Sequence, residues 1–190
     1  MAIDRKQLII EAAEKSFSLF GYKATTMEQV AKIAGVGKGT IYTFFTNKEE
    51  LFDEIMRGLV GKMKHIVEED YDDARPFFDN LDVLLNKILD FRSTHELAAK
   101  LSHEVRDIGT PMAQEGLRQL ERATLGYIQR KVQRAIDKGE IKPCDPEVTA
   151  FVLLKLYFAL ATDWDKTHQS MDKARIAGLF RMYLEQGIGV

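Results

Sequence analysis

Apolar side chains recur along most of this chain at intervals of three and four residues, the spacing that places them on one face of an α-helix. Strict alternation of apolar and polar residues, which is typical of half-buried strands, is scarce. Glycines, prolines and capping residues divide the pattern into separate segments. Helices are expected at residues 4–20, 27–34, 38–45, 51–69, 76–92, 95–106, 112–138, 146–165 and 172–186. The sequence therefore predicts an all-α protein.

The second and third predicted helices are joined by a tight turn. Two helices that cross steeply there need a small residue at the contact, a turn backbone that tolerates positive φ, and a branched anchor in the second helix. Ala31, Gly35 and Ile41 supply these features and indicate a helix-turn-helix, although two short amphipathic helices can also meet in this way by chance. The inward side chains are expected to be Val30, Ile33, Ala34, Ile41 and one of Phe44 and Phe45.

The first turn of the third helix carries side chains suited to a nucleic acid. Lys38 can reach guanine acceptors or phosphate, Gly39 allows a close approach, and Thr40 adds a hydroxyl. Tyr42 follows on the exposed side. Because the first turn of a recognition helix is the part that enters the major groove, this stretch favours double-stranded DNA as a partner.

The start of the next helix suits a phosphate group. Thr46 or Asn47 can cap it, and its free backbone amides together with Lys48 predict a phosphate clamp. Residues 1–48 hold seven Lys and Arg against four Asp and Glu, whereas the rest of the chain holds 20 against 25. A mildly basic N-terminal part on an acidic body is consistent with a polyanionic partner of that part.

The segment Thr26–Phe52, TMEQVAKIAGVGKGTIYTFFTNKEELF, resembles the DNA-binding domain of the TetR family of bacterial repressors. The threonine before the second helix, the glycine turn, the Thr-Ile-Tyr of the third helix and the Asn-Lys-Glu-Glu-Leu that follows match the family pattern. The resemblance implies phosphate contacts from Thr26, Tyr42 and Lys48, and base-edge contacts from Lys38, Gly39 and Thr40. Phe44 departs from a polar residue that some members have there, and both Phe44 and Phe45 are interpreted as core because large aromatic side chains are usually buried.

Two C-terminal helices carry more apolar surface than one small body can easily cover. The helix at 146–165 is apolar on nearly every side, and the helix at 172–186 adds a further apolar face. Pairing with the same two helices of a second chain buries both. In the family that the chain resembles, this pair is the dimer seam. We therefore expect a homodimer through helices at about 145–165 and 172–186.

A small-molecule effector is expected among the helices from Pro76 to Asp165, because bundle interiors are where such sites form. No buried pair of acids points to a cationic ligand, which favours an apolar or acyl effector. Each candidate is also of a type that ordinarily fills a core. The candidate ligand-binding residues are Phe77, Phe78, Phe91, His103, Met112, Phe151, Phe158 and Trp164.

Other chemistries find little support in the sequence. His103 and Glu104 are adjacent and so face different sides of a helix, while Asp163, Asp165 and His168 are interpreted as a solvated helix end rather than a metal site. No catalytic residues, metal or cofactor are expected. The single cysteine excludes an intramolecular disulfide. No membrane-spanning run and no signal-peptide pattern occur, so a cytoplasmic location is expected.

Together these features predict a DNA-binding helix-turn-helix domain at residues 1–48 and a ligand-binding and dimerisation helical domain at 49–190. The expected function is that of a ligand-responsive repressor, released from a palindromic operator by a small apolar or acyl effector. One alternative is a transcriptional activator of the same fold. Another, from a different class, is a helical ligand-binding or enzymatic bundle that binds no DNA, and salt-dependent binding to duplex DNA separates it from a regulator.

Overall fold

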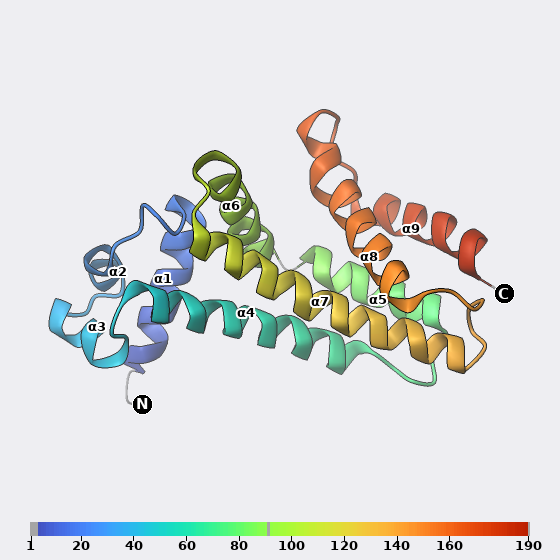
Figure 1. The fold of residues 1–190 in the computed structure, drawn as a ribbon, viewed down its shortest axis with the longest axis horizontal. Helices are drawn as coiled ribbons and strands as arrows, with labels where there is room; N and C mark the ends of the chain where they lie inside the picture. The colour runs from blue at the N-terminus through green and yellow to red at the C-terminus, as the bar shows by residue number, and fades with distance from the viewer. Residues whose placement is uncertain (1–3, 91, 190) are drawn as a thin grey trace. The chain divides into compact units, whose positions relative to one another are not determined.

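The computed structural model describes residues 4–90 and 92–189, apart from the side chains of residues 66–67 and 92–95. Over these residues the chain is helical and contains no strand, only an isolated bridge between Ile141 and Gly189 (Figure 1). The all-α prediction is confirmed. The helices are α1 (Arg5–Phe20), α2 (Met27–Ile33), α3 (Lys38–Phe44), α4 (Lys48–Asp70), α5 (Phe77–Asp90), α6 (Arg92–Ile108), α7 (Pro111–Asp137), α8 (Pro146–Phe158) and α9 (Lys173–Ile188).

The chain forms two compact units, each built from two separate stretches. Unit 1 comprises Met1–Lys62 and Arg92–Leu120, and unit 2 comprises Met63–Phe91 and Glu121–Val190. The long helices α4 and α7 each begin in unit 1 and end in unit 2. The boundary at residue 48, which divides the chain by function, stays a prediction.

Unit 1 is centred on α1, which packs against α2, α3 and α6. Ile9, Ala13 and Phe17 of α1 are fully buried. The ring of Phe17 lies 5.8 Å from that of Tyr22 and 5.3 Å from that of Phe52, and the Tyr22 and Phe52 rings are 4.9 Å apart, centroid to centroid. This aromatic contact joins α1, the loop after it and the start of α4.

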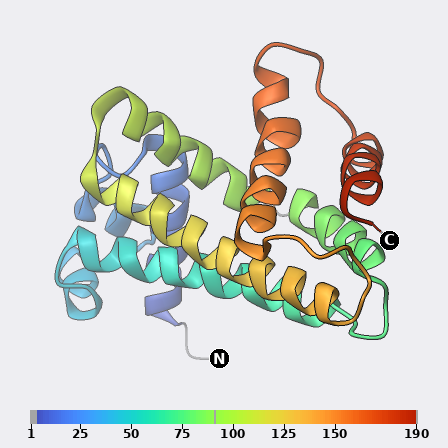
Figure 2. The same ribbon diagram turned by 45° about the vertical axis from the view of Figure 1, so that its right-hand side comes forward.

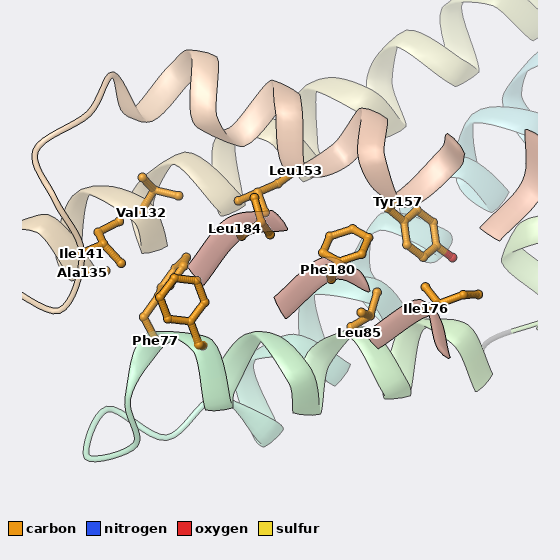
Figure 3. Close-up of a cluster of buried hydrophobic side chains, with 11 residues drawn as sticks. Phe77, Leu85, Val132, Ala135, Ile141, Leu153, Tyr157, Ile176, Phe180 and Leu184 are labelled. Atoms are coloured by element: carbon orange, nitrogen blue, oxygen red, sulfur yellow. The ribbon is translucent and has the colours of Figure 1, made fainter. Parts of the chain in front are cut away.

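Unit 2 is organised around an apolar cluster to which α5, α7, α8 and α9 contribute. Figure 3 shows Phe180 of α9 among Leu85, Tyr157 and Ile176, all of which are buried. The loop after α8 carries the chain to α9, which runs beside α5 (Figure 2). The same two C-terminal helices thus help to build the core of their own unit.

The opposite faces of α8 and α9 are uncovered in the single chain. Val148, Phe151 and Val152 of α8 are 57%, 48% and 48% exposed. On α9, Met182 and Tyr183 are 43% and 56% exposed. The surplus apolar surface inferred from the sequence is therefore present on both helices.

Two details of the predicted inward faces need correction. Ile33 was expected inside but is 44% exposed, because it lies about 200° around the helix from the buried Ala31. Of the two aromatic residues interpreted as core, Phe45 is buried at 3% exposure, whereas Phe44 is 38% exposed and the prediction for it is wrong. Phe45 follows Ile41 by four residues and shares its direction more closely than Phe44 does.

Candidate nucleic-acid interface

α2 begins at a threonine cap. Thr26 has an extended backbone, with φ −119° and ψ 155°, and its Oγ1 accepts a hydrogen bond of 3.2 Å from the amide of Gln29. The hydroxyl hydrogen remains available to donate outward, and Thr26 is exposed. The cap therefore presents a hydroxyl donor at the amino end of α2.

The turn between α2 and α3 has the geometry that the residue spacing predicted. Gly35 has φ +66°, in the left-handed region that glycine enters without strain. The amide of Val36 donates to the carbonyl of Ala31 over 3.0 Å. Ala31 is 3% exposed, and the anchor Ile41 is fully buried. The helix-turn-helix is confirmed.

The first turn of α3 faces outward. Lys38 and Gly39 are exposed, Thr40 is half-buried and Tyr42 is 43% exposed. A Cβ added at Gly39 meets no described atom within 4 Å, so this surface is open to a close approach. The Lys38 ammonium pairs with the Glu28 carboxylate of α2 at 2.7 Å. Their hydrogen bond raises the pKa of Lys38 and lowers that of Glu28, so both are charged near neutral pH.

Lys48 is the first residue of α4, and its ammonium turns back to the loop after α1. Its Nζ donates to the carbonyls of Tyr22 and Thr25 over 3.0 Å each, lies 3.5 Å from the carbonyl of Lys23, and sits 4.4 Å from the centroid of the Tyr22 ring. The Tyr22 hydroxyl donates to the carboxylate of Glu49 over 2.8 Å. Two successive residues of α4 thus tie its start to the loop that leads into α2.

The amino end of α4 is closed by its own side chains. Asn47 accepts a 2.8 Å hydrogen bond from the amide of Glu50, and the Glu50 carboxylate accepts one of 2.7 Å from the amide of Thr46. This arrangement resembles a capping box, except that the Glu50 carboxylate accepts from the residue before the cap instead of from the cap itself. One of the helix amides expected in the phosphate clamp, that of Glu50, therefore already has a partner within the chain.

A buried polar contact that the sequence did not reveal joins α1 to the loop after it. Thr25 Oγ1 donates to the carbonyl of Gly21 over 2.8 Å, so the 3.2 Å contact with Ser16 Oγ must have Ser16 as its donor. Ser16 and Thr25 are both fully buried. Both threonines before α2 are of a type that caps helices, but Thr26 caps α2 while Thr25 holds the loop.

A carboxylate of α6 reaches the same loop. Glu104 is 6% exposed, and its Oε1 accepts a 2.9 Å hydrogen bond from the amide of Lys23, 81 residues away in sequence. Its neighbour His103 is exposed and takes part in a hydrogen bond with Arg106. The prediction that His103 and Glu104 face different sides of a helix is confirmed. No sequence signal could have paired Glu104 with Lys23, because the partner is a backbone amide.

The predicted ligand-binding residues of unit 2 lie in two environments. Phe77 and Phe78 are part of its apolar cluster, and Phe158 packs against that cluster. Phe151 instead lines an open pocket of about 410 Å³ between α7 and α8, together with Leu125 of α7. Aromatic side chains are therefore available both inside unit 2 and on its surface.

The remaining ligand candidates lie elsewhere. His103 and Met112 belong to unit 1, where His103 lines a pocket of about 240 Å³. Trp164 begins a short 3₁₀ turn that follows a π-helical turn at Ala159–Asp163. Phe91 lies outside the described residues. The described candidates therefore belong to both units, and those of unit 2 lie in more than one environment.

The side chains around Trp164 make contacts that are ordinary at a protein surface. Asp163 pairs with Lys166, and the rings of Trp164 and His168 stack at a centroid distance of 3.9 Å. Among the residues described here, no three His, Cys, Asp or Glu side chains gather as a metal ion would require. None of the helices traced over residues 4–90 and 92–189 is both long and apolar enough to cross a membrane.

Comparison with known proteins decides what kind of helix-turn-helix this is. Residues 9–55 match the profile of the bacterial regulatory proteins of the tetR family. Over 188 residues, 99% of this chain and 98% of the relative, the sequence is 55% identical to the uncharacterized HTH-type transcriptional regulator YhgD of Bacillus subtilis. The chain belongs to the TetR family. It is thus a DNA-binding transcriptional regulator, and not an enzyme.

Solved structures of the TetR fold superpose on nearly the whole chain. The fatty acid degradation regulator FadR of Bacillus halodurans has a TM-score of 0.76 at 19% identity, with 97% of this chain and 96% of FadR covered. A complex of SmeT with triclosan has a TM-score of 0.81 at 20% identity, with 98% and 92% covered. TetR regulators act as dimers on DNA operators and bind small-molecule effectors.

Proposed function

We propose that this protein is a dimeric repressor that sits on a palindromic operator and leaves it when a small apolar or acyl effector binds. The observation that carries the proposal is the exposed first turn of α3, held on a helix-turn-helix whose anchor, Ile41, is fully buried. A rigid support under an exposed cation, an open glycine and a tyrosine is what reading the major groove requires. Such a regulator works where the operator DNA is, in the cytoplasm.

The six residues proposed to meet DNA divide into two roles. Thr26, Tyr42 and Lys48 contact phosphate, and Lys38, Gly39 and Thr40 face base edges. Thr26 retains a hydroxyl donor beyond its cap, and the Lys48 ammonium gives two of its three donors to carbonyls at 3.0 Å and the third to a weaker 3.5 Å contact with the carbonyl of Lys23. A phosphate therefore has to displace only the weakest of these three contacts for Lys48 to bind it and still hold the loop before α2.

The dimer is proposed to form through α8 and α9. Their exposed apolar side chains, led by Phe151 and Tyr183, form surface of the kind that marks an interaction site. A twofold dimer places two copies of α3 about 34–36 Å apart, or a multiple of that, on matching half-sites. One copy alone meets half of the operator.

The effector is proposed to enter unit 2, where Phe77, Phe78 and Phe158 offer apolar contacts. An apolar or acyl chain suits such a lining. The fold neighbour FadR, named as a fatty acid degradation regulator, supports the acyl class. Release needs only that the effector binds more tightly to a dimer whose half-site spacing does not fit the operator.

DNA binding is tested by fluorescence anisotropy with duplexes from the region that flanks the protein's own gene, over a series of salt concentrations. Wild type is expected to bind with steep salt dependence. Lys48→Ala and Tyr42→Phe should weaken binding to all sequences alike, and Lys48→Ala should lower the salt slope by about 0.9 because one phosphate contact is lost. Lys64→Ala, which removes an exposed lysine of α4, is the matched control. Unchanged affinity and slope for Lys48→Ala would contradict its phosphate role.

Dimerisation is tested by sedimentation of Phe151→Asp and Tyr183→Asp. Each places a charge in the proposed apolar seam, so mostly monomeric protein is expected, with operator affinity reduced at least about tenfold because half of the site is lost. Gln133→Asp, on an exposed part of α7, should remain dimeric. Variants that stay dimeric at micromolar concentration would place the seam elsewhere.

The effector class is tested with the wild-type protein on its operator. Long-chain acyl-CoA and free fatty acid are added separately, and release is followed by anisotropy. Transcription from the operator in vitro should be repressed by the protein and restored by the active compound. Release by neither compound, with operator binding intact, would reject the acyl class.

A further inference from the structure

Glu28 is an acid on the surface proposed to face DNA. It lies in the first turn of α2, and its Oε1 is 2.7 Å from the ammonium of Lys38 in the first turn of α3. Both side chains are well exposed, at 53% for Glu28 and 65% for Lys38. The pair therefore bridges two helices on the outside of the helix-turn-helix.

The presence of this ion pair is explained neither by a contribution to folding stability nor by simple attraction to DNA. Exposed ion pairs contribute little to folding, since water and salt screen them. The helix contact is already secured by the buried side chains of Ala31 and Ile41. A carboxylate at this surface also repels phosphates, so it weakens binding to a duplex of arbitrary sequence.

The pair matches the major-groove edge of a G·C pair. Thymine O4 and adenine N6 present a similar acceptor and donor, and the preference of lysine for guanine is what favours G·C. In the major groove, guanine presents the acceptors O6 and N7, and cytosine presents the N4 amino donor. O6 and N4 are hydrogen-bonded to each other and therefore lie about 2.9 Å apart. The ammonium and carboxylate of Lys38 and Glu28 are 2.7 Å apart, with a donor on one side and an acceptor on the other. Lysine is a common partner of guanine, and glutamate accepts from cytosine N4.

We propose that Glu28 and Lys38 act together as the specificity determinant for one G·C pair in each half-site of the operator. Lys38 donates to guanine, and Glu28 accepts from the N4 amino group of cytosine. On any other sequence the two charges remain paired with each other, and the acid opposes non-specific binding. This inference rests on the proposed function, since it assigns the reading of one base pair to the DNA-binding surface.

The inference is tested by selecting duplexes from a random-sequence library with wild type, Glu28→Ala and Lys38→Ala, followed by affinity measurements. Wild type should enrich a palindrome with a G·C pair at one equivalent position of each half-site. Replacing that pair by A·T should weaken wild-type binding about tenfold, and binding of Glu28→Ala by less than about threefold. Glu28→Ala should also bind random duplex several-fold more tightly than wild type, because a charge that repels phosphate is gone.

Glu11→Ala serves as the matched control, because it removes an exposed acid of α1 whose hydrogen bond is to Gln7. It should select the same sequences as wild type. If wild type enriches no duplex, the proposed function fails. If it enriches an operator in which no G·C position depends on Glu28, or one in which the position that depends on Glu28 is an A·T pair, only the inference about Glu28 and Lys38 is overturned.

Discussion

The interior of unit 1 and the interior of unit 2 are stabilised by different kinds of contact. In unit 1, hydrogen bonds donated by Ser16 and Thr25 and one accepted by Glu104 lie in the interior. In unit 2, the centre is an apolar cluster around Phe180, and charged side chains such as Arg181 lie at its surface. A buried polar side chain of this unit, Asn80, hydrogen-bonds to the loop before α5.

This difference fits the proposed division of roles, in which α2 and α3 meet DNA and unit 2 takes the effector. Hydrogen bonds are directional and expensive to leave unmade, so they fix the positions of α2 and α3 against a DNA groove of fixed shape. Apolar contacts depend on volume more than on direction, so an apolar core can repack around a ligand at modest cost. The variants described next test whether the contrast is energetic as well as geometric.

The largest loss of stability is expected from Phe180→Ala, which leaves a cavity in the centre of unit 2. Phe180 is 2% exposed, and removal of its ring should lower the free energy of unfolding by about 3–5 kcal/mol. Chemical denaturation at one fixed protein concentration measures it, since a dimer's stability depends on concentration. Phe180→Leu leaves a smaller cavity and should cost less. A loss below about 1 kcal/mol would mean that this cluster does not hold unit 2 together.

An intermediate loss of stability is expected from Thr25→Val in unit 1. This substitution keeps the shape of the side chain and removes its hydroxyl. The Gly21 carbonyl loses its donor and Ser16 loses its acceptor, at a cost of about 1–3 kcal/mol. Adding Ser16→Ala removes the stranded hydroxyl, so the double variant should be more stable than the sum of the two single losses predicts. Strict additivity in this double-mutant cycle would show that the two residues are not coupled.

The smallest loss of stability is expected from Tyr22→Phe, and the size of that loss should depend on pH. The hydrogen bond from Tyr22 is the main reason that the pKa of Glu49 lies below its ordinary 4.5. The stabilisation is therefore present above about pH 4.5 and lost as the pH falls through the lowered value. Because Glu49 is largely exposed, the difference from wild type at neutral pH should stay below about 1 kcal/mol and shrink in acid. Thermal melts of both proteins between about pH 3 and 7 measure it.

A matched variant separates titration of Glu49 from loss of the hydrogen bond. Glu49→Gln keeps an acceptor for the Tyr22 hydroxyl but cannot ionise, so the stability change caused by Tyr22→Phe in that background should not vary over the same acid range. If the difference in stability between wild type and Tyr22→Phe does not change over this pH range, the loss of stability in acid comes from other carboxylates.

The sequence predicted the helices well because their ends are determined locally. Caps such as Asp4, Thr26, Asp145 and Asp172 accept hydrogen bonds from amides two or three residues further on, and the residue types reveal them. The turn at Gly35 was predictable for the same reason, since its positive φ is a property of one residue.

The long-range contacts were not predictable, because they depend on the whole fold. Lys48 pairs with carbonyls, which every residue carries, and nothing in the residue types marks Tyr22 and Thr25 as the partners. Ile33 was predicted to be buried and is exposed. An apolar residue in a short helix can face solvent when neighbouring side chains already fill the helix contact. The roles of the DNA-facing residues and the lining of the effector site stay predictions.

The approach of Glu104 to Gly21 has a consequence for how this sequence can change over generations. Gly21 has φ +87°, and a Cβ built there would collide with the carboxylate of Glu104. A side chain at position 21 is therefore disfavoured twice, once by its own backbone and once by the carboxylate of Glu104, which would have to turn aside. A lineage that loses this glycine is therefore expected to change residue 104 as well, because a shorter side chain there relieves the collision.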